Sequence, residues 1–195
     1  LDSLSYSPYP AAAAVIVDLA AGTATDVGGA VTNIEHVIGG AGHDTLSGDD
    51  GANTLTGGPG ADTLSGGLGD DLYIFGDGWG TDTINEYTGE GQDTLDFSAV
   101  TYSLNADINA DITVSGNGNR ASHNGNHLEV VIGGSASDEF IISGARPVSL
   151  KGGPGQDTFI FEDTARLTNA AAIDGGIGID TLDYSGYGSG VIVNL

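Results

Sequence analysis

The chain has 195 residues, 34 of them glycine, no cysteine or methionine, and a formal net charge of −23 from 27 acidic and 4 basic side chains. Such an acidic chain lacks the basic patches that nucleic acids and anionic membrane surfaces require, so we exclude both as partners. No run reaches the roughly 18 apolar residues of a membrane span. Hydrophobic residues make up 39% of the chain and recur at regular intervals, which distinguishes it from a disordered acidic chain. We expect divalent cations to neutralise the acid.

Four nine-residue repeats stand in tandem in the first half of the chain. They follow the pattern G-G-x-G-x-D-x-U-x, where U is a large apolar residue: GGAGHDTLS (39–47), GDDGANTLT (48–56), GGPGADTLS (57–65) and GGLGDDLYI (66–74). The last three residues of each repeat predict a minimal strand with one inward side chain, namely Leu46, Leu55, Leu64 and Tyr73. Three residues do not form a stable strand alone, so we expect stacked coils that share one core.

The nonapeptide resembles the calcium-binding repeat of the RTX family. The resemblance implies an all-β fold, a right-handed parallel β-roll or β-solenoid, with calcium between turns eighteen residues apart. Each site would use carbonyls of the glycine turns and the side chains at position six. Carried onto this chain, one site is Gly40, Gly42 and Asp44 with Gly57, Pro59 and Asp62. The next, on the opposite edge, is Asp49, Gly51 and Asn53 with Gly66, Leu68 and Asp71. Asn53 departs from the consensus Asp, so we expect this site to be weaker.

Beyond Phe75 the repeats continue in looser register. Asp82 and Asp93 are candidate ligands below Asp62 and Asp71. Further candidates lie in the second half of the chain, at Asp138, Gly152, Pro154, Asp157 and Asp180. The stretch SGARPVSL (143–150) has lost its Asp, so we expect no calcium on that edge of its coil. The whole chain is expected to bind several calcium ions, four or more.

A second period of about 90 residues lies over the first, and such fixed periods are typical of solenoids. NIEHVIGG (33–40) recurs as HLEVVIGG (127–134), which pairs Glu35 with Glu129. We expect these two acids to share a structural role, either a capping hydrogen bond or a calcium ligand. The period predicts a first module at 1–97, a degenerate second at 98–184 and the start of a third at 185–195. We therefore expect the chain to be a segment of a longer protein.

Three other features carry weaker signals. Trp79, the only tryptophan, is expected to cover the open end of a four-coil roll rather than to bind sugar. The four histidines, two of which lie in SHNGNH (122–127), are expected to be solvated rather than to bind a transition metal. The stretch 115–127 is expected to form a surface loop or a degenerate repeat.

No catalytic motif is present: the sequence lacks HExxH, GxSxG, a cysteine nucleophile and a phosphate-binding GK[ST] loop. We therefore predict a non-catalytic segment. The first interpretation is a calcium-dependent structural and adhesive segment of a bacterial cell-surface protein, secreted unfolded by the type I route and folded outside by calcium. Its further partners would be neighbouring copies or modules, or a cell-surface polysaccharide. The alternative is the accessory tail of a secreted protease, lipase or alginate epimerase, or of a cytolysin.

Overall fold

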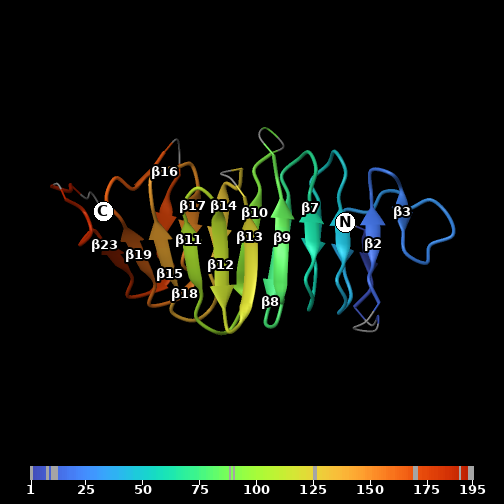
Figure 1. Ribbon diagram of the computed structural model, residues 1–195, viewed down its shortest axis with the longest axis horizontal. Coiled ribbons are helices and arrows are strands. Elements are labelled where there is room, and N and C mark those ends of the chain that lie inside the picture. Colours follow the sequence, from blue (N-terminus) through green and yellow to red (C-terminus); the bar gives the residue numbers. More distant parts are fainter. Residues whose placement is uncertain are drawn as a thin grey trace.

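The computed structural model describes residues 2–7, 9, 13–87, 89, 91–124, 127–168, 171–188 and 190–192. Its regular elements are all β-strands, which stand side by side along the long axis of the molecule (Figure 1). No helix in the described ranges has the length and apolar character needed to cross a membrane. Of the predicted third module, residues 189 and 193–195 lie outside the described residues.

Two sheets form the walls of the molecule. The first sheet has eight strands, and every pair in it is parallel. In spatial order these are β1 (Ser3–Ser5), β4 (His36–Ile38), β6 (Thr54–Thr56), β8 (Leu72–Gly76), β10 (Thr94–Ala99), β14 (Val130–Ile132), β17 (Ser149–Lys151) and β21 (Ile173–Asp174). Neighbouring strands are never consecutive in the chain, because the chain passes through the second sheet between them.

The second sheet has eleven strands, most of them parallel. In spatial order from the C-terminal end they are β23 (Thr181–Asp183), β19 (Thr158–Phe161), β15 (Glu139–Ile142), β11 (Asn105–Ile108), β12 (Ile112–Gly116), β13 (Asn119–His123), β9 (Thr81–Asn85), β7 (Thr63–Ser65), β5 (Thr45–Ser47), β2 (Ile16–Asp18) and β3 (Thr23–Ala24). Two small parallel pairs complete the fold: β16 (Ala145–Arg146) with β20 (Arg166–Leu167), and β18 (Pro154–Gly155) with β22 (Ile177–Gly178). The predicted all-β parallel β-roll is confirmed.

The core lies between the two sheets and is built one side chain per strand. Leu46 faces Leu64 in the register of β5 and β7, and Leu55 faces Tyr73 in the register of β6 and β8. All four side chains are fully buried, as the repeat pattern predicts. Burial of this kind accumulates with each coil, since each coil contacts mainly its neighbours.

The longer strands after Tyr73 enclose an aromatic core. The rings of Phe75 and Phe97 stack at a centroid distance of 4.4 Å, and Trp79 packs edge-on against both. Trp79 is only 2% exposed, and β10 and β14 continue the stack beyond it. The expectation that Trp79 covers an open end is therefore wrong. The roll does not end there, and the large indole fills the wider interior between the longer strands.

Strands occupy residues 112–116 and 119–123, so the predicted surface loop is wrong for this part of the stretch 115–127, and residues 125 and 126 lie outside the described residues. Here β11, β12 and β13 form an antiparallel three-stranded unit, with β13 pairing to β9 and β11 to β15. Asn117 and Gly118 have positive φ angles of 47° and 83° and form the two-residue turn between β12 and β13. In the first sheet, only β10 lies between β8 and β14. In the second sheet, the three strands β13, β12 and β11 lie between β9 and β15.

The predicted boundary between modules, at residue 97, falls inside β10. Both sheets continue across it, through β14 in the first sheet and through β13 to β11 in the second. The division into modules of about 90 residues remains a prediction about the sequence period.

Candidate metal centres along the edges of the roll

Carboxylates form a column along one edge of the roll, where the chain enters the strands of the second sheet. The backbone N–H of Asp44 donates to Asp62 Oδ1 (2.8 Å), and that of Asp62 donates to Asp82 Oδ1 (3.0 Å). At the top of the column Val15 N–H donates to Asp44 Oδ1 (2.8 Å). All three aspartates are at most 2% exposed. The structure thus brings the predicted residues Asp44, Asp62 and Asp82 into one stack.

The opposite edge carries a second column, at the entry to the first sheet. Asn53 N–H donates to Asp71 Oδ1 (2.7 Å), Asp71 N–H to Asp93 Oδ1 (2.9 Å), and Asp93 N–H to Glu129 Oε2 (2.8 Å). Glu35 accepts the N–H of Asp2 in the same way (3.0 Å). Each glutamate therefore accepts a backbone N–H from another segment, which agrees with the hydrogen-bonding alternative of the shared role expected for Glu35 and Glu129. Both glutamates occupy the position that Asp holds in the nonapeptide.

The first edge resumes beyond the β11–β13 unit. Leu104 N–H donates to Asp138 Oδ1, Asp138 N–H to Asp157 Oδ1 (both 2.8 Å), and Asp157 N–H to Asp180 Oδ1 (3.0 Å). Asp138 and Asp157 are nineteen residues apart, and Asp157 and Asp180 twenty-three. These hydrogen bonds keep the carboxylates on adjacent turns despite the irregular spacing.

The second carboxylate oxygens of Asp44, Asp62 and Asp157 lie beside the first glycine of their own turns. Asp62 Oδ2, Asp82 Oδ2 and Asp157 Oδ2 are buried without a hydrogen-bond partner. Those of Asp44 and Asp138 accept the N–H of Gly40 and Gly134, both at 2.6 Å. A buried carboxylate oxygen without a donor is costly unless a cation or a proton compensates it.

Backbone carbonyls complete a cradle between successive turns. A Cβ atom at Gly58, whose φ is +95°, would lie 2.3 Å from the carbonyl oxygen of Gly40, and one at Gly60 would lie 2.0 Å from that of Gly42. From the facing turn, the carbonyl oxygen of Gly57 would lie 2.3 Å from a Cβ at Gly39. Only glycine allows these carbonyls to stand so close to the next turn.

The same arrangement recurs on the other edge and in the second half of the chain. The carbonyls of Asp49, Gly51 and Gly66 would meet a Cβ on the facing turn at 2.3, 2.9 and 2.1 Å, and that of Gly152 at 2.6 Å. The Asp49 carbonyl also accepts the N–H of Leu68 (3.1 Å). The residues at the third turn position are exposed and have apolar side chains without a donor atom, so only their backbone carbonyls are available as ligands: Pro59, Leu68 and Pro154. Carbonyl and carboxylate oxygens are the donors that Ca²⁺ prefers, so the residues fit calcium.

The coil at 143–150 carries an apolar side chain where the column on its edge would place a carboxylate. Val148 stands directly before β17, where the column would place an Asp, and it is 1% exposed. An apolar side chain there adds to the core and offers no ligand.

Glu86 is a buried acid that the repeat pattern did not reveal. It lies directly after β9, at the position of the first repeat glycine, and is 2% exposed. Glu86, Asp71 and Asp93 each place a carboxylate oxygen within 4.8 Å of the others, and the Tyr73 hydroxyl donates to Glu86. The only sequence signal was an acid in place of a consensus glycine.

Burial strongly shifts the protonation of the first column. It raises the pKa of Asp62 to about 6 and that of Asp82 to about 8, and repulsion between neighbouring carboxylates adds to both shifts. Burial likewise raises the pKa of Asp138 to about 6, and it raises the pKa values of Asp157 and Glu129. Without a cation, these buried carboxyl groups therefore keep their protons to a higher pH than exposed carboxyl groups do.

The predicted solvated state of the histidines is wrong for His123. His43 is exposed, but His123 is 2% exposed, and burial lowers its pKa. Its burial follows from its place at the end of β13, a strand that the sequence interpretation did not include.

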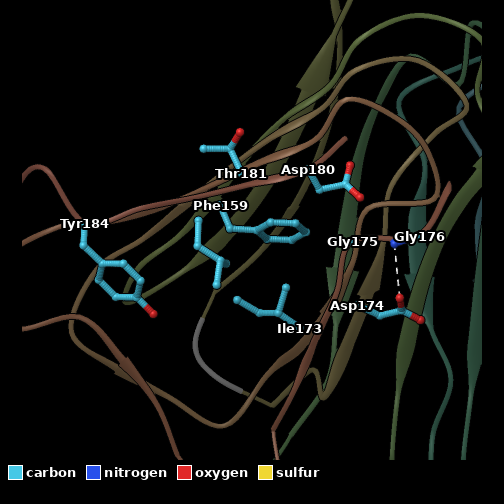
Figure 2. Close-up of a pocket in the computed structure, with 9 residues that line it drawn as sticks. Phe159, Ile173, Asp174, Gly175, Gly176, Asp180, Thr181 and Tyr184 are labelled. Carbon is cyan, nitrogen blue, oxygen red and sulfur yellow. Dashed lines mark hydrogen bonds between the residues drawn. The ribbon is translucent and has the colours of Figure 1, made fainter. Parts of the chain in front are cut away.

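An open cavity of about 630 Å³ lies at the C-terminal end of the stack (Figure 2). Apolar side chains of the last coils line it together with Asp174 and Asp180: Phe159, Ile173, Leu182 and Tyr184. These side chains continue the core stack, and among the described residues no further strand pairs with β21 or β23, so the cavity is an open end of the core.

Two family models match the chain. Residues 38–73 match the RTX calcium-binding nonapeptide repeat in four copies, and residues 83–174 match the C-terminal domain of peptidase M10 serralysin. No match was found among curated protein sequences. The fold and its acid-lined turns define a parallel β-roll of calcium-binding repeats. Within that class, the chain carries the repeats of the RTX family.

Proposed function

We propose that the turns bind several Ca²⁺ ions and that these ions make folding possible. The columns provide a carboxylate pair for each ion: Asp44 with Asp62, Asp62 with Asp82, Asp71 with Asp93, Asp138 with Asp157 and Asp157 with Asp180. Asn53 with Asp71 would form a further site of lower charge. The observation that carries the proposal is the set of buried Oδ2 atoms without hydrogen-bond partners, at Asp62, Asp82 and Asp157.

The free energy from calcium is large enough to decide folding. Extracellular calcium modules have dissociation constants of about 10⁻⁴–10⁻³ M. At about 1 mM calcium, a site of about 10⁻⁴ M adds about 1.4 kcal/mol by mass action. Four such sites contribute about 5–6 kcal/mol, comparable with the whole stability of an ordinary domain.

The test is a calcium titration of the chain from chelator, followed by far-UV circular dichroism, with magnesium as control. We expect a cooperative transition from coil to β between about 0.1 and 10 mM calcium and none with magnesium. A β spectrum that persists in chelator at neutral pH would mean that the apolar stack folds alone.

For the parent protein we propose a secreted bacterial surface protein in which this roll is a structural and adhesive segment. The net charge of −23 favours it, because repulsion keeps the chain open where calcium is scarce and calcium closes it outside the cell. The uncovered end of the core supports a neighbouring module or copy as partner. Calcium-dependent adhesion of cells displaying the segment, with a cell-surface polysaccharide as first ligand, tests this role.

The second candidate is the accessory tail of a secreted enzyme, and one finding favours it. Residues 83–174 match the C-terminal domain of serralysin, a peptidase. The two candidates differ in what precedes the segment in the parent protein. A catalytic domain upstream, with activity that requires calcium refolding of this roll, supports the tail; tandem modules of about 90 residues support the surface protein.

A further inference from the structure

The turn that leaves β13 differs from the glycine turns on the same edge. It follows the turns that carry Asp71 and Asp93, and Glu129 continues their column. Here, however, the turn has a histidine at each side: His123 ends β13, and His127 lies just before the strand β14. Imidazole nitrogens are poor ligands for Ca²⁺ and good ligands for transition metals.

His123 is held in one orientation by the strand beside it. Its Nδ1 lies 3.1 Å from the carbonyl oxygen of Ile84 on β9. Because a carbonyl only accepts hydrogen bonds, Nδ1 must carry the proton, and the lone pair is left on Nε2. His123 Nε2 is buried and has no hydrogen-bond partner. A backbone carbonyl on one ring nitrogen with the other free is the usual support of a metal-binding histidine.

His127 brings a second imidazole to the same place. The ring centroids of His123 and His127 are 5.7 Å apart, with the planes at 79°. His127 Nδ1 is also buried without a hydrogen-bond partner. Two imidazoles bound to one tetrahedral ion, with metal–nitrogen distances of about 2.0–2.1 Å, have centroids roughly 5 Å apart. The observed separation is close to that value.

We propose that His123 Nε2 and His127 Nδ1 bind a transition-metal ion of the Zn²⁺ class, with water completing its coordination. The nearby carboxylate of Glu129 supplies negative charge without leaving its hydrogen bond to Asp93. The ion joins the end of the β11–β13 unit to the segment that leads into β14. This site is separate from the calcium columns in both donor type and metal.

The experiment measures Zn²⁺ binding to the whole chain by calorimetry with calcium saturating, so that the oxygen sites are filled. We expect one zinc ion per chain, and at least about tenfold weaker binding in His123→Ala and in His127→Ala. The matched control is His36→Ala, because His36 Nε2 is also buried without a partner but has no second imidazole beside it. Equal zinc affinity in the wild type and in His127→Ala would overturn the proposal.

Zinc-edge X-ray absorption of the wild type gives a second readout that needs no variant. Imidazole scattering from two rings supports the proposal even if His123→Ala fails to fold, and a shell of oxygen ligands alone overturns it. Circular dichroism of each variant in calcium shows whether the variant still folds. In the wild-type chain, intact calcium-induced folding without zinc binding refutes only the histidine site, whereas zinc binding without a calcium requirement for folding refutes only the calcium proposal.

Discussion

At the scale of single residues, the carboxylate at position six does two things at once. One oxygen of Asp62 accepts the N–H of Asp44, and the other is buried beside Gly57 without a hydrogen-bond donor. The first contact aligns adjacent coils, and the second provides a ligand. An Asn can perform the first role without the charge needed for the second.

Asp62→Asn therefore separates the two roles. Asp62 would be shared by the ions above and below it, so we expect the calcium midpoint of folding to rise by about tenfold or more, the equivalent of about 1.4 kcal/mol per weakened site. Asp50→Asn, at an exposed acid two residues along from the first glycine of its repeat, serves as control and should leave the midpoint unchanged. An unchanged midpoint in Asp62→Asn would remove Asp62 from the ligand set.

Asn53→Asp makes the opposite change and restores the repeat consensus. With calcium, we expect folding at a lower calcium concentration, because the site gains a charge. In chelator, we expect less residual structure, because a further buried carboxylate adds repulsion to Asp71. The same calcium titration checks both halves, and a midpoint that rises in Asn53→Asp contradicts the placement of Asn53 in a site.

At the scale of elements, the turns restrict the choice of residues more than the strands do. A three-residue strand such as β5 or β7 requires only one inward apolar side chain of suitable size. The turns bring backbone carbonyls so close to the next coil that a side chain is excluded at particular glycines.

Gly58→Ala tests this constraint. The new Cβ would lie 2.3 Å from the Gly40 carbonyl oxygen, at a φ of +95° that alanine rarely adopts. We expect a loss of about 2 kcal/mol or more in unfolding free energy, measured by urea denaturation in calcium. Gly28→Ala is the matched control, because a Cβ there meets no atom within 4 Å. Equal stability of the two variants would mean that the turn opens at little cost.

At the scale of the whole molecule, the columns make stability depend on either protons or calcium. The folded-state pKa values of Asp62, Asp138 and Asp82 are raised to about 6, 6 and 8 from an ordinary value of 3.8. The folded state therefore binds more protons than the unfolded state across this range, and its stability falls as pH rises.

We predict that the calcium-free chain has its greatest β content below about pH 4 and loses it progressively as the pH rises through 6 to 8. Calcium added at pH 8 should restore the fold, because the ion replaces the protons. Circular dichroism in chelator across this pH range measures the effect. Stability that rises with pH in chelator would show that the carboxylates are ionised and compensated within the fold.

The sequence by itself determined the repeating unit. The apolar residue at every ninth position predicts the stacked core, and the glycines and Asp predict acid-lined turns, because both depend on contacts between adjacent copies of one short pattern. Where the spacing varies, as between Asp157 and Asp180, the sequence leaves the pairing uncertain, and the hydrogen-bond ladder of the folded roll decides it.

Only the tertiary structure decided what happens between the repeats. The antiparallel β11–β13 unit, the burial of Trp79 and His123, and the approach of Glu86 to Asp71 and Asp93 all depend on contacts across coils that share no repeat spacing. Asn117 and Gly118 form the turn of a hairpin that was not predicted, and the partners of this unit, β9 and β15, are distant in the chain. Local sequence patterns carry no information on such partners, because packing in the folded chain determines which strand an irregular segment pairs with.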